Sequence, residues 1–155
     1  MVDAQGPALL AALAARPGLV KPNRTELAAT TGRALVTEAD VATAMRELAM
    51  RGAQRVVVTA GRHASLAFDG HTFWRVSVPS VEAVNPIGSG DAFTAGLVSR
   101  LTRGDDLGEA CRWGTAAGAA NALTSLAGEI NRADVERLAR NVEARPFRLE
   151  RPAPQ

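Results

Sequence analysis

The segment 84–93, Val-Asn-Pro-Ile-Gly-Ser-Gly-Asp-Ala-Phe, limits the folds open to this chain more than any other. The Asn85-Pro86 step ends a β-branched run, because proline lacks an amide hydrogen and restricts the residue before it. Two glycines then flank Ser89, and from Asp91 apolar residues recur at helical spacing. A strand that leads through a glycine turn into a helix is typical of α/β proteins.

The glycines of this segment suit a phosphate-binding loop. Gly88 and Gly90 reach backbone angles closed to other residues, so successive N–H groups can point inward as an anion nest at a helix N-terminus. Asp91 lies at its mouth, where a carboxylate can accept a proton from a hydroxyl that attacks a phosphoryl group. The alternative is an ordinary strand-to-helix turn in which Asp91 only favours the helix dipole. The pattern is neither a dinucleotide fingerprint nor a Walker loop.

Hydrophobic periodicity places helices and strands along the whole chain. The expected elements are a strand end at 1–3, a helix from Pro7, a short strand at 19–20, helices from Asn23 to Gly32 and from Thr37 to Gly52, a buried parallel strand at 55–60, antiparallel strands at 64–68 and 72–78, helices from Asp91, Asp106 and Asn131, and a strand at 147–149. This order predicts an α/β fold with a layered, Rossmann-like sheet and flanking helices. Because the chain begins in mid-strand, we expect that sheet to be truncated at its N-terminus.

Asn23 and Glu26 have two compatible interpretations. Asn at an N-cap with Glu three positions later is a capping box, which is complete without a ligand, and the residues alone favour it. The same carboxylate also suits a magnesium-bound phosphate. It would meet that group through water, because Mg²⁺ keeps much of its hydration shell.

Three further residues are candidates for ligand contact. Thr59 and Gly61 follow the buried strand at its carboxyl end, where open α/β sheets bind ligands; the alternative is an ordinary strand end. Asn121 shares a helical face with small residues, among them Gly114 and Gly118, which admit another backbone or a flat ligand. Asn121 therefore either donates to a nucleotide base or reaches a loop carbonyl.

Composition and charge argue against several partners. The formal net charge is only +2, and no Lys/Arg cluster is interleaved with aromatic residues, so we do not expect nucleic acid as a partner. No stretch approaches the length of a membrane span, and no signal-peptide pattern is present. The single Cys111 cannot form an internal disulfide, and its helical setting among small residues indicates a buried thiol in a reducing compartment. We expect a cytoplasmic soluble domain that self-associates through the exposed edge of the truncated sheet.

The order of these motifs resembles the PfkB/ribokinase family of carbohydrate kinases. The motifs are Lys-Pro-Asn-x-x-Glu, Val-Val-Val-Thr-x-Gly, Asn-Pro-x-Gly-Ser-Gly-Asp-Ala-Phe and Gly-Ala-Ala-Asn-Ala, and the resemblance runs from about Val2 to Leu138. The Asn85-Pro86 variant is similar to the branch that contains 1-phosphofructokinase and tagatose-6-phosphate kinase. The resemblance implies that residues 1–150 form the C-terminal part of a ribokinase-like kinase domain, followed by a frayed tail at 151–155.

The resemblance implies ATP and Mg²⁺ as cofactors and a sugar or sugar phosphate as substrate. Asp91 would accept the proton of the sugar hydroxyl, while the Gly88, Ser89 and Gly90 amides would hold the charge on the transferred phosphoryl group. Other implied contacts are magnesium with Asn23 and Glu26, through water or phosphate, and the nucleotide with Thr59, Gly61 and Asn121.

Two residues depart from the family pattern. Ala64 stands where the family usually has a second glycine, which affects the shape of the nucleotide loop. Asn85 replaces the aspartate that supports a monovalent-cation site in ribokinase, so we do not expect that site here.

The sequence favours two functions over a third, a generic Rossmann-like domain with no preference for ATP. Family members are considerably longer, and their N-terminal half supplies a sugar-binding motif and a lid that excludes water from the reaction. Neither is found in this sequence. We therefore expect either an ATP-dependent carbohydrate kinase, present as its C-terminal part, or a nucleotide-binding module or inactive remnant without catalysis.

Overall fold

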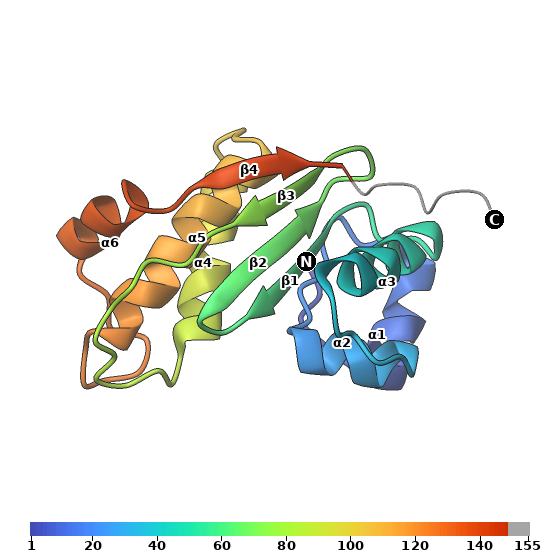
Figure 1. Cartoon of the computed structure of the whole chain (residues 1–155), viewed down its shortest axis with the longest axis horizontal. Helices are drawn as coiled ribbons and strands as arrows, with labels where there is room; N and C mark the ends of the chain where they lie inside the picture. The colour runs from blue at the N-terminus through green and yellow to red at the C-terminus, as the bar shows by residue number, and fades with distance from the viewer. Residues whose placement is uncertain (149–155) are drawn as a thin grey trace. The chain divides into compact units, whose positions relative to one another are not determined.

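The computed structural model describes residues 1–148 of the 155-residue chain. Its elements are α1 (Gly6–Ala12), a 3-10 turn η1 (Leu13–Ala15), α2 (Arg24–Thr31), α3 (Glu38–Met50), β1 (Val56–Ala60), β2 (His63–Phe68), β3 (Phe73–Val76), α4 (Ser89–Leu101), α5 (Leu107–Ala122), α6 (Arg132–Ala139) and β4 (Ala144–Phe147) (Figure 1). All six predicted helices are present, which confirms this part of the prediction. Leu149, the last residue of the final predicted strand, and the predicted tail at 151–155 lie outside the described residues.

Most helices begin at a side chain that accepts a free amide of the first turn. Asn23 and Thr37 head α2 and α3 with complete capping boxes, as predicted. Asp106 caps α5 by accepting the N–H of Glu109 at 2.8 Å. The Glu109 carboxylate does not return that bond, because it accepts hydrogen bonds from Arg112 and Trp113 instead.

The four named strands form one antiparallel sheet in the order β1–β2–β3–β4 (Figure 1). This confirms the antiparallel strands predicted around Asp69-Gly70, and the parallel strand predicted at 55–60 is confirmed by parallel bridges from Val56 and Thr59. In the described part of the chain, parallel pairing is confined to isolated bridges that join Val2 with Val20, Val20 with Val56, and Asn23 with Thr59. Gly61, with φ of 60°, turns the chain straight back after β1, so the next strand pairs antiparallel. The buried run Val56–Ala60 thus pairs parallel with the segment at 20–23 and antiparallel with β2.

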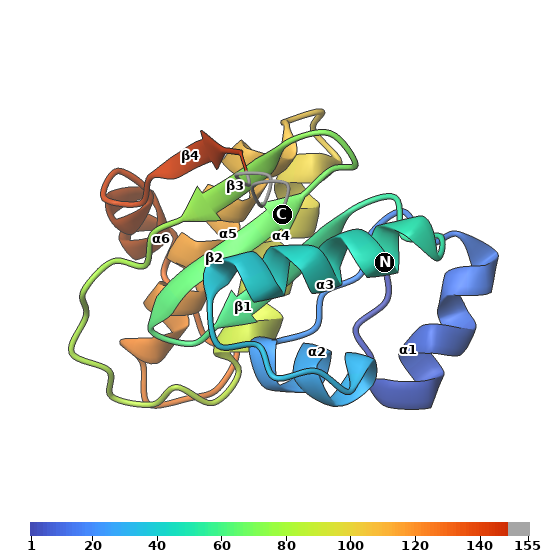
Figure 2. The same ribbon diagram turned by 45° about the vertical axis from the view of Figure 1, so that its right-hand side comes forward.

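The chain divides into two compact units. Of the described residues, 1–61, 65–74 and 146–148 form the first, and 62–64 and 75–145 form the second. In the first unit, α2 and α3 contact β1 (Figure 2). Its core is built from aliphatic and aromatic side chains that include Leu9, Val20, Leu27, Met45, Leu48, Val56, Phe68 and Phe73. The first unit thus buries the face of β1 and the predicted apolar stripes of its helices.

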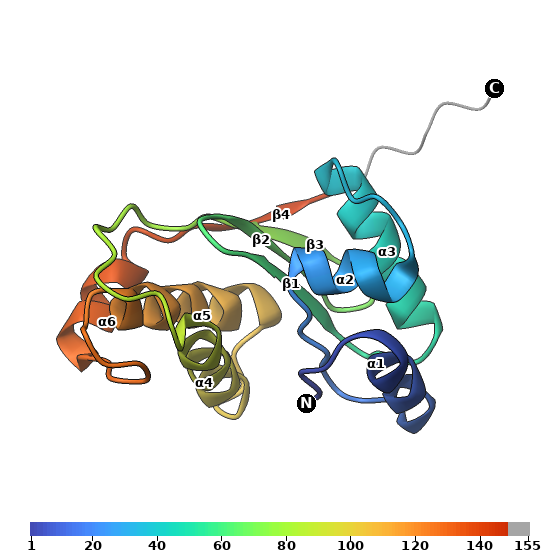
Figure 3. The ribbon, with the colours of Figure 1, turned by 90° about the horizontal axis from the view of Figure 1, so that it is seen from below.

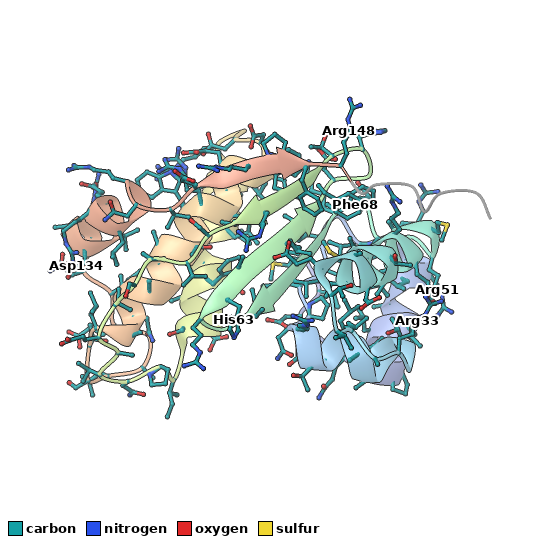
Figure 4. The ribbon with its side chains drawn as sticks, in the orientation of Figure 1. Arg33, Arg51, His63, Phe68, Asp134 and Arg148 are labelled. Carbon is teal, nitrogen blue, oxygen red and sulfur yellow. The ribbon has the colours of Figure 1, made fainter. Side chains whose placement is uncertain are left out.

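Charged residues on the first unit form a small network at the surface. Arg33 and Arg51 both pair with Glu47, at 3.3 and 3.1 Å (Figure 4). Both guanidinium groups are about half exposed to solvent, so each pair contributes little to stability. The fold of this unit therefore depends on its apolar core.

The second unit is organised by close packing of α4 against α5, with α6 against α5 (Figure 3). A Cβ atom added to Gly114 would lie 2.9 Å from the carbonyl oxygen of Phe93, and one added to Gly118 would lie 2.9 Å from that of Ser89. The sequence left open whether the small residues on this face of α5 admit another backbone or a flat ligand. In the structure they admit the backbone of α4.

The helices of residues 1–148 include none that is both long and apolar enough to span a membrane.

Candidate functional site

The start of α4 leaves backbone donors free. Gly88 is its N-cap residue, with φ of 85°, and no side chain caps the helix. Ser89 N–H donates to the Pro86 carbonyl at 3.2 Å, and Ala92 N–H donates to the Gly88 carbonyl at 2.9 Å. The N–H groups of Gly90 and Asp91 have no acceptor among the described residues. Unpaired first-turn amides and the positive end of the helix dipole together favour an anion.

Asp91 lies in the first turn of α4 and is exposed. Within residues 1–148, its carboxylate has neither an ion pair nor a hydrogen bond, whereas Asp105 and Asp134 in the same unit pair with arginines. The carboxylate is thus free to accept a proton from a hydroxyl group that approaches the helix N-terminus. Both alternatives for Asp91 that the sequence left open are compatible with this position.

Asn121 is the polar side chain buried closest to this helix start, and its exposed fraction is 0%. Its Nδ2 donates to the Ile87 carbonyl at 2.8 Å and to Ser89 Oγ at 3.2 Å, while its Oδ1 accepts the N–H of Gly128 at 2.7 Å. The sequence left open a nucleotide base or a loop carbonyl as its partner; in this structure the partner is a loop carbonyl.

Asn85 makes a second link beside Asn121. Its Nδ2 donates to the Ser125 carbonyl at 3.0 Å, and its Oδ1 accepts the Ile87 N–H at 3.0 Å. The N–H groups of Val84 and Asn85 both donate to the carbonyl of Ala122. Sequence reasoning assigned Asn85 no hydrogen-bonding role, and it missed Gly128, whose only signal in the sequence is a glycine between two predicted helices.

A second group of predicted residues gathers at the carboxyl end of β1, within the first unit. A parallel backbone bridge joins Asn23 to Thr59, and the Thr59 N–H donates to the Pro22 carbonyl at 3.3 Å. Asn23 Oδ1 accepts the N–H of Glu26 at 2.9 Å, and Glu26 Oε2 accepts that of Asn23 at 2.7 Å. The structure thus brings Asn23, Glu26 and Thr59 together, and Gly61 follows in the turn after β1.

The capping box uses only part of the polar atoms of Asn23 and Glu26. Glu26 Oε1 and Asn23 Nδ2 have no hydrogen-bond partner in the described chain, and both residues are half-buried. One oxygen remains to accept from water, and one amide remains to donate to an anion. The predicted cap is confirmed, and it leaves room for the second interpretation.

Lys21 adds a charged group that sequence reasoning did not assign. It is 5% exposed, and its Nζ lies 2.9 Å from the Asp3 carboxylate. As the only lysine of the chain, it belongs to the Lys-Pro-Asn motif, two positions before Asn23. Its pairing with Asp3 satisfies the charge that burial would otherwise penalise.

The His, Cys, Asp and Glu side chains of the described residues do not gather into a metal centre. Residues 1–148 hold no group of three or more His, Cys, Asp or Glu residues that could bind a metal ion. Cys111 is buried, as predicted, and burial raises the pKa of its thiol well above the usual range. The predicted site residues therefore fall into two groups: Gly88, Ser89, Gly90, Asp91 and Asn121 in the second unit, and Asn23, Glu26, Thr59 and Gly61 in the first.

Comparison with known proteins identifies relatives of about twice this length. The chain is 41% identical over 115 residues to 1-phosphofructokinase of Rhodobacter capsulatus, an alignment that covers 74% of this chain and 36% of that protein. Escherichia coli phosphofructokinase-2 in complex with fructose-6-phosphate superposes with a TM-score of 0.80 at 35% identity, covering 91% of this chain and 45% of that one. Arabidopsis thaliana ribokinase complexed with ribose and ATP gives a TM-score of 0.72 at 27% identity, covering 78% and 40%.

These likenesses agree with the order of motifs along the chain. The chain spans less than half the length of each of these relatives. Residues 1–133 match the pfkB family of carbohydrate kinases. The chain belongs to this family.

Proposed function

We propose that this chain supplies the nucleotide-binding and proton-accepting part of an ATP-dependent kinase that phosphorylates a hydroxyl group of a sugar or sugar phosphate, as 1-phosphofructokinase does. The observation that carries the proposal is the start of α4, where free amides and an unpaired carboxylate lie within one helical turn. Family membership supports the reaction type, and the identity to 1-phosphofructokinase supports the substrate class.

Each group at the start of α4 has a role in this proposal. Asp91 accepts the proton of the attacking hydroxyl as the bond to phosphorus forms. The amides of Gly88, Ser89 and Gly90 hold the negative charge that develops on the transferred phosphoryl group. Gly90 N–H is already without an acceptor, whereas Ser89 N–H would exchange its 3.2 Å hydrogen bond to Pro86 for the ligand.

Asn23 and Glu26 fit an indirect role toward magnesium. Glu26 Oε1 is free to accept from a water molecule of a hydrated ion, and Asn23 Nδ2 is free to donate to a phosphate oxygen. An amide N–H cannot ligate a cation, so Asn23 would hold the phosphate and not the metal. Magnesium would supply charge neutralisation for the ATP phosphates.

Thr59, Gly61 and Asn121 are proposed to border the nucleotide. Thr59 is half-buried and Gly61 is exposed in the turn, with open space where a Cβ would stand. Both N–H donors of Asn121 are used within the chain and its side chain is fully buried, so it would reach the nucleotide only through the backbone that it holds. The buried unpaired thiol of Cys111 supports the cytoplasm as the site of this reaction.

Self-association through a sheet edge is a separate proposal. β4 is the last strand in the sheet order, and its Arg145 and Pro146 are exposed. Charged side chains and proline oppose edge pairing. We therefore expect β4 to pair with another chain less readily than the opposite edge of the sheet. Light scattering over a concentration series tests the proposal, and a monomer at all concentrations would exclude it.

The function is tested by Mg·ATP titration calorimetry together with a coupled kinase assay on fructose 1-phosphate and fructose 6-phosphate. Binding with turnover supports the kinase. Binding without turnover supports the alternative, a nucleotide-binding module without catalysis. A chain that neither binds Mg·ATP nor transfers its phosphoryl group would overturn both.

The role of Asp91 is tested by Asp91→Asn in the active protein. Loss of the proton acceptor should lower kcat by about 10²–10⁴-fold with nearly unchanged ATP affinity, because only the transition state needs the base. Asp134→Asn is the matched control, since Asp134 also lies in the first turn of a helix of the second unit (Figure 4). Turnover that survives in Asp91→Asn would remove Asp91 from its assigned role.

A further inference from the structure

Two loops of the second unit are joined by asparagine side chains. We call residues 85–91 the cradle loop and residues 123–130 the α5–α6 loop. Asn121 lies at the end of α5 and hydrogen-bonds to both loops, through Ile87 and Ser89 on one side and Gly128 on the other. Asn85 of the cradle loop donates to Ser125 of the α5–α6 loop. Four side-chain hydrogen bonds thus join the two loops, one directly and three through Asn121.

The partners of Asn121 determine the orientation of its amide. The Ile87 carbonyl can only accept and the Gly128 N–H can only donate, so Nδ2 must face Ile87 and Oδ1 must face Gly128. Because the side chain is fully buried, any movement that broke these bonds would leave polar atoms unpaired and away from water. The amide therefore resists displacement of either loop.

Gly88 allows the two loops to approach closely. A Cβ atom at this position would lie 2.9 Å from the backbone nitrogen of Gly128 and 3.3 Å from Asn121 Oδ1. The backbone of Gly88 also has φ of 85°, which an L side chain rarely adopts. The contact between the loops is thus made by backbone and buried amide, with no flexible side chain between them.

We infer that Asn121, assisted by Asn85, is a positioning residue for phosphoryl transfer: it fixes the amides at the start of α4 in place before the ligand arrives and does not contact the nucleotide itself. This inference rests on the proposed function. Both hydrogen-bonding ends of Asn121 are occupied within the chain, so no donor remains for a base. Donors that are already oriented stabilise the developing charge most, because the reaction then requires no reorganisation.

The test compares three alanine substitutions of asparagine. Asn121→Ala removes the buried side chain that holds both loops, which we call the Asn121 clamp. Asn85→Ala removes the hydrogen bond to Ser125 at a half-exposed position, where we expect a smaller loss of stability. Asn141→Ala is the control, because Asn141 is exposed and its side chain has no hydrogen bond within residues 1–148. Amide hydrogen exchange of the chain without ligand is measured first. We expect exchange in both loops to rise by about tenfold in Asn121→Ala, and to a lesser degree in Asn85→Ala, with no change in Asn141→Ala.

The kinetic readout separates positioning from direct contact. In the active protein, kcat should fall by about tenfold or more in Asn121→Ala, while KM for Mg·ATP stays within about threefold, because the amides act in the transition state. A tenfold rise in KM for Mg·ATP with unchanged loop exchange would overturn the inference in favour of direct nucleotide contact. If Asn121→Ala does not fold, the same criteria apply to Asn85→Ala.

The exchange measurement also distinguishes this inference from the proposed function. A native chain that does not bind Mg·ATP overturns the proposed function. Unchanged exchange in the cradle loop of a folded Asn121→Ala overturns the clamp, whether or not the chain binds nucleotide.

Discussion

At the start of α2, the side chains of Asn23 and Glu26 pair with free backbone amides, whereas at the start of α4 no side chain does so. Each of the two helices follows a segment that carries family motifs, and each has a carboxylate in its first turn. A side-chain cap stabilises a helix by about 1 kcal/mol, so α4 lacks a contribution that α2 receives. The difference shows that α4 begins without a side-chain cap, at the expense of local stability, while α2 combines a complete cap with two unused polar atoms.

Gly88→Ala should have the largest effect on the start of α4, and so on the difference between the two helix starts. The substitution places a side chain at φ of 85° and a Cβ 2.9 Å from the Gly128 nitrogen, so we expect the free energy of unfolding to fall by about 2–4 kcal/mol. Phosphate and ATP binding should weaken with it, because the start of α4 must shift. Urea unfolding and calorimetry measure both effects.

Gly104→Ala provides the control for strain without collision. Gly104 has φ of 90°, but a Cβ there would meet no atom within 4 Å. We expect a loss of about 1–2 kcal/mol from the left-handed backbone alone. Equal losses in the two variants would show that the close approach of the loops contributes nothing.

Glu26→Gln should separate the cap of α2 from its proposed role toward magnesium. Glutamine still accepts the N–H of Asn23, so stability should change by less than about 0.5 kcal/mol. The lost negative charge should raise the magnesium concentration needed for half-maximal turnover by about tenfold.

Asp40→Asn is the matched control, because Asp40 occupies the same capping-box position in α3. Hydrogen bonds from Thr37 hold the pKa of the Asp40 carboxyl below its usual range, so a small loss of stability is expected there, without any change in magnesium dependence. An identical magnesium response in the two variants would leave Glu26 with its capping role alone.

Substitution of Glu109 should have the smallest effect. We expect it to change how the stability of the second unit depends on pH. The hydrogen bond from Arg112, aided by Trp113, lowers the pKa of its carboxyl from 4.5. A carboxyl group with a lowered pKa stabilises the fold above its unfolded value, and this stabilisation is lost as the pH falls through the folded value. Glu109→Gln should therefore reduce the free energy of unfolding by about 1 kcal/mol near pH 6 and by less near pH 3.

Urea unfolding of Glu109→Gln and the native chain at the two pH values measures this difference. The substitution keeps the backbone N–H that Asp106 accepts, so the helix cap is unchanged. A loss of stability that is the same at both pH values would show that the carboxylate charge has no part in holding α5.

The local features of the fold could be predicted because their causes lie within a few residues. The capping boxes of α2 and α3 join residues three positions apart, and the stripe of Val41, Met45 and Leu48 identifies the buried face of α3. The Asp69-Gly70 pair likewise predicts a turn between two strands from the residues alone. Helix and turn positions therefore followed from the residues alone.

The partners of β1 and of Asn121 depended on the tertiary structure. A run such as Val56–Ala60 is buried in either sheet type, and only the turn at Gly61 decides that its named neighbour is antiparallel. Glu109 has a position suited to a capping box, yet the nearby Arg112 and Trp113 compete for its carboxylate.

The sequence by itself determined the family, the caps and the glycine-flanked start of α4, because each is written in short motifs whose spacing sets local geometry. Only the tertiary structure decided what Asn121 does. Its partners Ile87 and Gly128 lie 34 and 7 positions away, and they become neighbours when α4 packs against α5 through glycines that no side chain could replace. A buried amide takes its role from the backbone groups that packing brings to it, and these are not visible in the spacing of residues along the chain.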